Sequence, residues 1–413
     1  MVIFPLSKRL WTGIIAVGVL IYLFIESGTR GDFHIFLAAS TDLFDQKDIY
    51  HTLYFTCYHY YYSILFAILI YPLTFLNSQV ALFLWLLLNV FFIYRIVKFV
   101  TELLPLNVLS KKQQMWFWLF SFLFSIRLLM ENFHVAQMTI CLLYLTLEGF
   151  LLIQKDKTYS GAFLIALGIN IKLLPLVILP YLLYRGKIKA SLLIILFYAV
   201  LLFLPILFIG KTQFDSLISS WAELINPLNK QHLMDVSERS FHSLSTFLSV
   251  LLIEKAREID ALPLKRNIAD ISLQSLYTVI LCCRLTLAAF TLYFLKTMPF
   301  QKSLNLLHQF WELSYILLVV PLLFPHQQHY AFLFMIPAFM YCAYYLLAFK
   351  DQKSKIFIYV TSGELILIYF AVNLKLLLGE FNPYYEHFKI LTYGALLLIV
   401  VLATLQPKRK VEI

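Results

Sequence analysis

The sequence predicts an all-α membrane protein that crosses the lipid bilayer many times. Of its 413 residues, 61% are hydrophobic and only 14% are charged, whereas a soluble domain carries about 25% charged residues. Long apolar runs recur along the whole chain, and a membrane helix needs about 20 such residues. The five cysteines show neither a CxxC pair nor a His/Cys ligand spacing, so the sequence indicates no disulfide framework and no zinc site.

Thirteen apolar runs are candidates for membrane helices. They occupy residues 10–26, 60–76, 79–97, 113–130, 135–153, 159–170, 173–184, 191–209, 271–295, 310–324, 330–349, 356–378 and 388–405. Cytoplasmic loops of membrane proteins carry an excess of lysine and arginine, so basic clusters should mark that side. The clusters are Lys8 and Arg9; Arg95, Lys98, Lys111 and Lys112; Lys155 and Lys157; Arg185, Lys187 and Lys189; Lys296 and Lys302; Lys350, Lys353 and Lys355; and Lys408, Arg409 and Lys410. All of them face the cytoplasm only if the chain crosses an odd number of times between residues 27 and 95, where two apolar runs lie.

The run at 60–76 is the one that we expect to stay at the outer surface. It begins within an aromatic cluster at 58–62, which suits the headgroup level of a membrane, and it contains Pro72. We therefore predict a juxtamembrane helix there and about twelve crossings, with both termini in the cytoplasm. The runs at 159–170 and 173–184 are short for full crossings, so they are tilted, broken or re-entrant.

This topology predicts a single transmembrane domain over residues 1–413 with two large outer loops. The first loop, 27–78, holds the juxtamembrane helix, and the second loop spans 210–270. The first apolar run lacks a small-residue cleavage site and follows basic residues, as in a retained signal anchor. Ionisable groups beside a membrane are costly and therefore informative, and here they gather in the outer loops and outer turns.

Asp32 is the first of these groups. It stands in Arg30-Gly31-Asp32-Phe33, ahead of a segment with apolar residues at near-helical spacing. Such a segment can lie flat on the outer leaflet, and its N-terminus would stabilise the carboxylate. Asp48 and Tyr50 follow in the same loop. The plain alternative is that Asp32 is a helix N-cap and Asp48 belongs to a solvated face, and spacing alone leaves both interpretations open.

Gln137 and Lys172 lie at two further polar positions. Gln137 ends the polar stretch 131–137 at the outer end of two spans, where hydrogen bonding between helices is the plain alternative to a role in binding. Lys172 separates the two short runs. It either snorkels to the interface or binds a lipid phosphate, for which an ammonium group is a good partner.

His326 and His329 belong to a short polar segment between two apolar runs. Their spacing would let them share one helix face as a metal pair, but no third ligand has a suitable spacing. Hydrogen bonding to a sugar or phosphate is therefore the favoured role. Arg239 belongs to the densest polar stretch of the long outer loop, 238–243. The absence of P-loop, GxGxxG, GxSxG and HExxH patterns disfavours an ATP-driven pump and the common hydrolases.

Several of these short motifs together resemble glycosyltransferase family 87, a family of polyprenyl-phosphate-mannose-dependent membrane mannosyltransferases with the GT-C fold. The similar segments are Gly31-Asp32-Phe33, Ala38-Ala39, Asp48-Ile49-Tyr50, Ala136-Gln137, Lys172 with Pro175 and Pro180, and Pro325 to His329 with Pro337. They are spread over roughly residues 30–340. The sequence departs from the family at Ala136, where glycine is usual, and at Tyr330, where a second histidine is common.

The resemblance implies a GT-C architecture and transfer of a hexose, mannose first, with inversion, from a polyprenyl-phosphate donor. The acceptor would be a lipid-linked or envelope glycan on the outer face of the plasma (inner) membrane. Asp32 would be the catalytic base, and Lys172, His329, His326 and Arg239 would bind the donor phosphate or sugar. Asp48, Tyr50 and Gln137 would bind the acceptor or the sugar. No cofactor and no metal are expected, and the net charge of +10 is interpreted as a sign of membrane topology and not of nucleic-acid binding. Membrane lipid is the remaining expected partner.

Two other functions stay open at this point. A lipid-linked glycan polymerase or ligase would also have about twelve spans and a large outer loop, with its main arginines in outer loops. A transporter or flippase would show internal repeats and ionisable groups near the middle of the membrane. No repeat is visible in the sequence.

Overall fold

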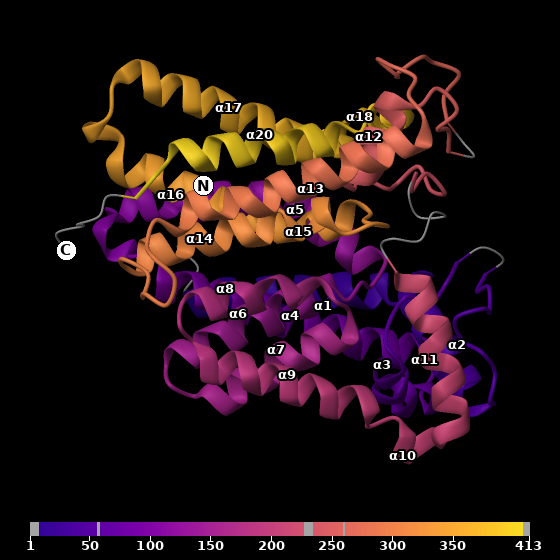
Figure 1. Cartoon of the computed structure of the whole chain (residues 1–413). Coiled ribbons are helices and arrows are strands. Elements are labelled where there is room, and N and C mark those ends of the chain that lie inside the picture. Colours follow the sequence, from indigo (N-terminus) through magenta and orange to yellow (C-terminus); the bar gives the residue numbers. More distant parts are fainter. Residues whose placement is uncertain (1–7, 56–57, 227–233, 259–260, 408–413) are drawn as a thin grey trace, which may run out of the picture.

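The computed structural model describes residues 8–55, 58–226, 234–258 and 261–407 of the chain, without the side chains of residues 8–11. All regular elements among these residues are helices (Figure 1). The helices of the first half are α1 (Lys8–Glu26), α2 (Asp32–Phe44), α3 (Ile64–Ile70), η1 (Tyr71–Phe75), α4 (Ser78–Leu103), η2 (Leu106–Val108), α5 (Lys111–His134), α6 (Thr139–Gln154), α7 (Thr158–Ile171), η3 (Leu174–Val177), α8 (Ile178–Tyr184), α9 (Ile188–Phe203), α10 (Ile206–Ile209) and α11 (Lys211–Ile225). Those of the second half are α12 (Leu244–Leu252), α13 (Leu273–Leu295), α14 (Leu306–Leu318), α15 (Val320–Leu323), η5 (His329–Met335), α16 (Ile336–Phe349), η6 (Lys350–Gln352), α17 (Lys355–Asn373), α18 (Lys375–Leu378), η7 (Gly379–Phe381), α19 (Asn382–His387) and α20 (Ile390–Thr404).

The helices form two layers. In Figure 1 the lower layer holds α1 to α4 and α6 to α11, and the upper layer holds α12 to α20. Helix α5 belongs to the upper layer although it comes early in the chain, because it packs against η5, α16 and α17. The short segment between α5 and α6 therefore links the two layers, and residues near it can contact both layers.

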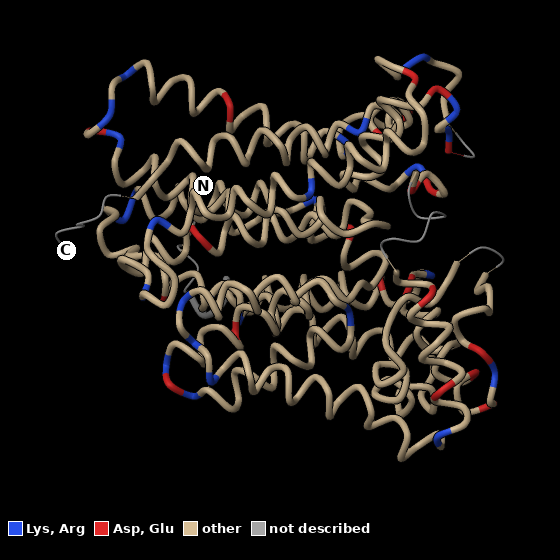
Figure 2. Tube along the Cα trace, viewed as in Figure 1, with Lys and Arg blue, Asp and Glu red and all other residues tan. Residues whose placement is uncertain are grey.

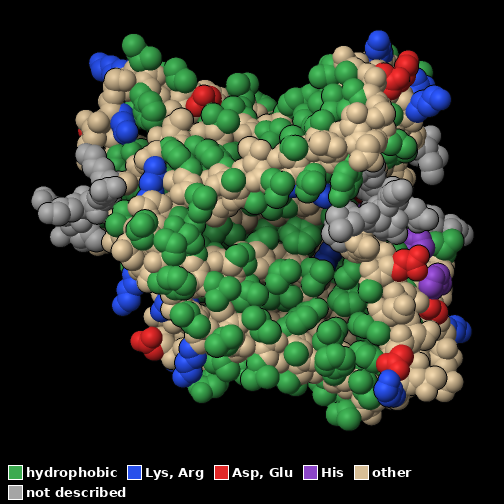
Figure 3. All heavy atoms as spheres, viewed as in Figure 1, with side chains coloured by type: hydrophobic (Ala, Val, Ile, Leu, Met, Phe, Trp, Pro, Cys, Tyr) green, Lys and Arg blue, Asp and Glu red, His purple; other side chains and the backbone are tan. Residues whose placement is uncertain are grey.

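The length and apolarity of the helices agree with a polytopic membrane protein. Six helical stretches are long and apolar enough to cross a membrane, or up to eight if each of two bent helix pairs is one span. Four shorter apolar stretches, at 12–26, 64–75, 158–171 and 174–184, fall below that length. Hydrophobic side chains cover the middle of the face in Figure 3, and charged ones gather toward its two ends. Twelve crossings stay a prediction.

The two ends of the molecule differ in charge. The loops that join α6 to α7, α8 to α9 and α16 to α17 lie together at the left of Figure 1, and blue segments mark them in Figure 2. These loops hold three of the basic clusters, and we call this end the basic end. Helices α2, α11 and α12 lie at the opposite end. The last basic cluster, at 408–410, lies outside the described residues.

The two segments that were expected to be outer loops, 27–78 and 210–270, contain helices that pack against other helices. The loop 27–78 holds α2, α3 and η1, which pack against one another. Ser63 begins α3 as an N-cap, since its Oγ accepts from the backbone N–H of Phe66 at 3.2 Å. The loop 210–270 holds α11 and α12, and Ser243 caps α12 in the same way, accepting from the N–H of Thr246 at 3.2 Å.

Helices α6 and α7 approach closely because two glycines face each other. A Cβ on Gly161 would lie 2.5 Å from the carbonyl oxygen of Gly149, a distance that real Cβ atoms do not reach. Small residues at a helix contact let backbones pack tightly inside a membrane. Helix α7 then ends at Ile171, and Lys172 lies in the non-helical interruption before η3. The two short apolar runs predicted from the sequence are thus two separate helical stretches with the lysine between them.

Candidate active site

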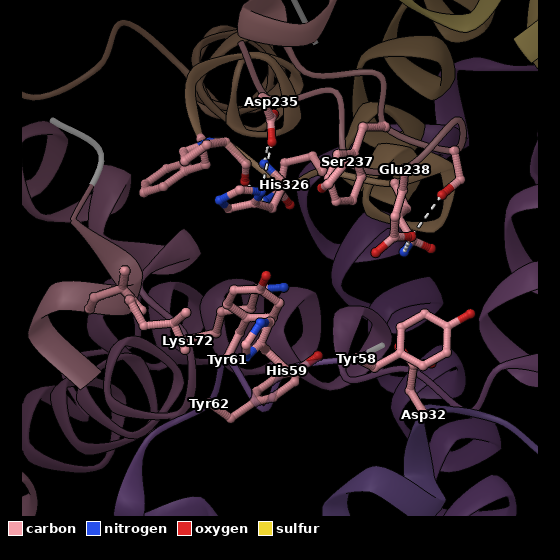
Figure 4. A pocket seen from close by; sticks show the side chains of 18 of the residues that line it. Asp32, Tyr58, His59, Tyr61, Tyr62, Lys172, Asp235, Ser237, Glu238 and His326 are labelled. Atoms are coloured by element: carbon pink, nitrogen blue, oxygen red, sulfur yellow. Dashed lines mark hydrogen bonds and ion pairs between the residues drawn. The ribbon is translucent and has the colours of Figure 1, made fainter. Parts of the chain in front are cut away.

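A cavity of about 1010 Å³ opens between the two layers at the end opposite to the basic end. In Figure 4 its residues face each other from two walls. The first wall comes from the first half of the chain and carries Asp32, Tyr58, His59, Tyr61, Tyr62 and Lys172. The second wall comes from the second half and carries Asp235, Ser237, Glu238 and His326.

Asp32 is the first residue of α2, and Gly31 is the N-cap. The alternative that Asp32 itself caps the helix is therefore wrong. The backbone N–H of Asp32 donates to the carbonyl oxygen of Val135 at 2.9 Å, so the start of α2 rests on the segment between α5 and α6. Gly31 permits this approach, because a Cβ there would lie 2.7 Å from the same oxygen.

Gln137 holds the carboxylate of Asp32 in place. The side-chain amide of Gln137 donates from Nε2 to Oδ2 of Asp32. Its Oε1 accepts from the hydroxyl of Tyr62 at 2.8 Å. Because a hydroxyl donor occupies the amide oxygen, the amide nitrogen faces Asp32. We expected Gln137 to bind the acceptor or the sugar; in the structure it is buried and binds Asp32.

Asp32 is a suitable proton acceptor at neutral pH. Burial and, to a smaller extent, the carboxylate of Glu238 raise the pKa of Asp32 to about 7, while Lys172 acts in the opposite direction. A general base works best when its pKa lies near the pH at which the enzyme operates. The oxygen Oδ2 is engaged by Gln137, so Oδ1 is the atom left to accept a proton.

Lys172 extends from the break between α7 and η3. Its backbone is extended, with φ −153° and ψ 136°. Ser63 fixes the end of α7, because its Oγ donates to Oδ1 of Asn170 at 3.0 Å. The ammonium nitrogen of Lys172 lies 5.2 Å from the centre of the Tyr62 ring. Burial lowers the pKa of Lys172 to about 8, against the opposing effect of Asp32. The cation thus lies on the same wall as the expected base.

A buried aspartate orients His326 on the second wall. Oδ1 of Asp235 lies 2.6 Å from Nδ1 of His326, and Oδ2 accepts from the backbone N–H of His326 at 2.9 Å. The hydroxyl of Ser243 also donates to Oδ2, at 2.6 Å. Burial opposes ionisation of Asp235, but the imidazole and these hydrogen bonds hold the pKa of Asp235 below its usual value. The ring of His326 stacks on Tyr61 of the first wall, with centres 5.5 Å apart.

Glu238 comes from the same loop as Asp235. Its Oε2 accepts from Nε2 of Gln328 at 2.6 Å and from the hydroxyl of Ser240 at 3.2 Å. Burial raises the pKa of Glu238 above its usual value. Figure 4 places it across the cavity from Asp32.

His329 belongs to a cluster of charged side chains that we call the Lys375 cluster, made of Glu131, His329, Lys375 and Glu386. The ammonium nitrogen of Lys375 lies 2.8 Å from Nε2 of His329 and 2.9 Å from Oε1 of Glu386. Glu131 lies 3.5 Å from the same nitrogen. Lys375, Glu386 and His329 all line the cavity.

The other expected residues divide into two groups. Arg239 and Tyr50 line the cavity, and the hydroxyl of Tyr50 donates to the carbonyl oxygen of Tyr62 at 3.0 Å. Asp48 is not among the described residues that line it. Its Oδ1 accepts from the backbone N–H of Tyr50 at 2.9 Å and its Oδ2 from the hydroxyl of Ser220 at 2.9 Å. Asp48 thus joins the first outer loop to α11.

The structure therefore brings six of the eight expected residues to one cavity: Asp32, Tyr50, Lys172, Arg239, His326 and His329. It adds Asp235, Glu238, Lys375 and Glu386, which the sequence analysis did not select. Lys375 had a usable signal, since it is a lysine inside the apolar run 356–378. Among the described residues, no three His, Cys, Asp or Glu side chains are grouped as metal ligands.

Comparison with known proteins gives one match. The sequence model described as Glycosyltransferase family 87 matches residues 60–321, which is more than half of the chain. The matched region contains Lys172, Asp235 and Glu238, whereas Asp32 precedes it and His326 follows it. No curated protein and no solved structure matches the chain.

Proposed function

Since the chain belongs to glycosyltransferase family 87, we propose that it transfers a hexose, mannose first, from a polyprenyl-phosphate donor to a hydroxyl group of a lipid-linked or envelope glycan. Family membership itself indicates a membrane glycosyltransferase. The donor, the acceptor, inversion at the sugar and the outer position of the site belong to the proposal.

One observation carries the proposal: Asp32 and Lys172 lie on one wall of a large cavity at the end opposite to the basic end. If the basic end faces the cytoplasm, the cavity opens on the extracytoplasmic side, where nucleotide sugars are lacking. A transferase there needs a sugar donor that is carried by a lipid. We place the protein in the plasma (inner) membrane as a GT-C-type domain with about twelve crossings and both termini inside.

The reaction follows from the chemistry of the two residues. The acceptor hydroxyl oxygen attacks the anomeric carbon, and its proton passes to Asp32 as the new bond forms. The bond between the anomeric carbon and the phosphate oxygen breaks, and its electron pair leaves with the polyprenyl phosphate. The leaving phosphate gains a negative charge, which the ammonium group of Lys172 stabilises. Attack from the face opposite to the leaving group inverts the configuration.

His326 and the Lys375 cluster give the cavity further polar groups for the donor. Asp235 fixes the orientation of the His326 ring, and Lys375 reaches the cavity with His329. We assign His326, His329 and Arg239 to the phosphate and sugar of the donor. Phosphate is a good leaving group at neutral pH, with a second pKa of about 6, so these groups need only stabilise charge.

The test is transfer by the purified full chain in liposomes, with polyprenyl-phosphate mannose as the first donor and other polyprenyl-phosphate hexoses after it. Asp32→Asn should lower transfer at least about 100-fold, because a general base contributes about 10²- to 10⁴-fold. Asp45→Asn is the matched control, since Asp45 is exposed at the other end of α2. Transfer by Asp32→Asn near the wild-type rate would contradict the assignment of the base. Failure with every lipid-linked donor would contradict the proposed function.

A further inference from the structure

A second carboxylate faces the expected base across the cavity. Asp32 lies on the first wall and Glu238 on the second (Figure 4). Sugar transfer from a phosphate donor needs one base and no carboxylic acid, because the leaving phosphate requires no proton. The reaction proposed above therefore leaves Glu238 without a role, although it lines the same cavity.

Glu238 is held by one oxygen only. Oε2 accepts both hydrogen bonds, from Gln328 and from Ser240. Within the described residues, Oε1 accepts no hydrogen bond from a side chain or the backbone. The loop that carries Glu238 is itself fixed to the segment before η5, because the backbone N–H of His242 donates to the carbonyl oxygen of Gln327 at 2.8 Å. One carboxylate oxygen is thus positioned while the other stays available to a ligand.

The arrangement is costly without a ligand. Burial raises the pKa of both Asp32 and Glu238, and the carboxylate of Glu238 further disfavours the ionisation of Asp32. A ligand with hydroxyl groups between the two walls would offset this cost, because a hydroxyl donates a hydrogen bond to a carboxylate. A phosphate would add to the repulsion. The chemistry of this side of the cavity therefore fits the sugar and does not fit the phosphate.

We propose that Glu238 accepts a hydrogen bond from a hydroxyl group of the transferred hexose through Oε1, and that it thereby selects the donor sugar. This inference rests on the proposed function. It divides the cavity between the leaving phosphate near Lys172 and the hexose hydroxyl at Glu238. A hydrogen bond to a charged group contributes about 1.5–3 kcal/mol, equivalent to about 10- to 100-fold in rate.

The experiment compares the wild type and Glu238→Gln with polyprenyl-phosphate mannose and with its 2-, 3-, 4- and 6-deoxy analogues. For the parent donor, Glu238→Gln should lower kcat/KM by about 10- to 100-fold. For one of the deoxy donors, kcat/KM of the wild type should be lower than for the parent donor by a similar factor. For the same deoxy donor, kcat/KM of Glu238→Gln should be little lower than its own value for the parent donor. The coupling between one hydroxyl and Glu238 is obtained from the ratio of kcat/KM for the parent donor to kcat/KM for the deoxy donor, measured on the same protein sample. Because an unfolded fraction lowers both values equally, it does not change this ratio.

Glu254→Gln is the matched control, because Glu254 is exposed in the same outer loop and does not line the cavity. It should behave as the wild type with every donor. An equal loss with all donors, or no loss, in Glu238→Gln would overturn the role of Glu238 and leave the proposed function intact. A wild type that transfers from no polyprenyl-phosphate hexose would overturn both.

Discussion

Asp32 and Lys172 have pKa values that burial shifts toward each other. Asp32 must be ionised to accept a proton, and its pKa is raised to about 7, so kcat/KM should fall as the pH drops below about 7. Lys172 must be protonated to stabilise the phosphate, and its pKa is lowered to about 8, so kcat/KM should fall as the pH rises above about 8. A pH profile of kcat/KM for the free enzyme should therefore be a narrow bell.

The variant Lys172→Arg separates the two limbs of this profile. Arginine stays charged at high pH, so the alkaline limb should shift to much higher pH while the acid limb stays near pH 7. An alkaline limb that is unchanged in Lys172→Arg would show that another group titrates there, and the phosphate role of Lys172 would be wrong.

Gln137 determines how Asp32 presents its second oxygen. Gln137→Ala removes the donor to Oδ2 of Asp32 and should lower kcat by about 10- to 100-fold with little change in KM, because a hydrogen bond to a charged group is lost. Gln137→Glu places a carboxylate beside Asp32, so the pKa of Asp32 should rise. The acid limb of the pH profile should then move above pH 7.

This pH shift distinguishes positioning from sugar binding. If Gln137 contacted the sugar, both variants would raise KM and the acid limb would stay in place. Steady-state kinetics with the donor identified by the screen, measured across pH, provides both readouts.

The sequence identified residues whose chemistry is unusual where they stand. Asp32, Lys172, His326 and His329 are ionisable groups in the segments between apolar runs, and all four line the cavity. The sequence could not identify Glu238 as a partner across the cavity, since that placement depends on how two distant loops pack. It could not show that Asp48 binds its own loop and α11 and does not line the cavity among the described residues, because a carboxylate that binds its own loop looks the same in sequence as one that binds a ligand.

The start of α2 and the segment between α5 and α6 are two elements that position the base. Gly31→Ala would place a Cβ 2.7 Å from the carbonyl oxygen of Val135, so α2 must move away and take Asp32 with it. A small displacement of a catalytic group can cost about 10²-fold in rate. We expect a loss of transfer of about that size, with the thermal unfolding midpoint lowered by a few degrees at most.

Gly28→Ala is the control at the element scale. Its nearest neighbour would be 3.4 Å away, which a small adjustment relieves. It should keep transfer within about 2-fold of the wild type. Equal activity of Gly31→Ala and Gly28→Ala would contradict the idea that the close approach at Gly31 positions Asp32.

At the same scale, the sequence analysis predicted most helices, including those of the first outer loop, but not α11 and α12 in the second outer loop. The runs at 159–170 and 173–184 correspond to α7 and to η3 with α8. Helix α11 was not predicted, because polar residues separate its apolar ones and it lies in a segment that was assigned as a loop from its polarity. Its buried residues, Phe214, Leu217 and Trp221, form one face of the helix, so a search for helical periodicity inside the loop would have found it.

For the whole molecule, charge indicates orientation but leaves the packing undetermined. The basic clusters of the described loops mark one end of the structure (Figure 2), as the sequence predicts. Lysine and arginine counts cannot say which helices are neighbours, so they do not reveal that α5 joins the upper layer. The cavity depends on this placement of α5 in the upper layer, since the backbone N–H of Asp32 binds the segment that follows α5.

The proposed orientation places the cavity outside and the loop between α6 and α7 inside. Ser237 lines the cavity and Lys157 lies in that loop, and both side chains are exposed. In intact cells a membrane-impermeant maleimide should therefore label Ser237→Cys, whereas Lys157→Cys should react only after the cells are permeabilised. The wild type measures the background from the native cysteines, of which Cys282 is exposed. Polyprenyl-phosphate mannose should slow labelling of Ser237→Cys, because the donor occupies the cavity. Labelling of Lys157→Cys in intact cells would reverse the orientation, and the lipid-carried donor would then lose its physical reason.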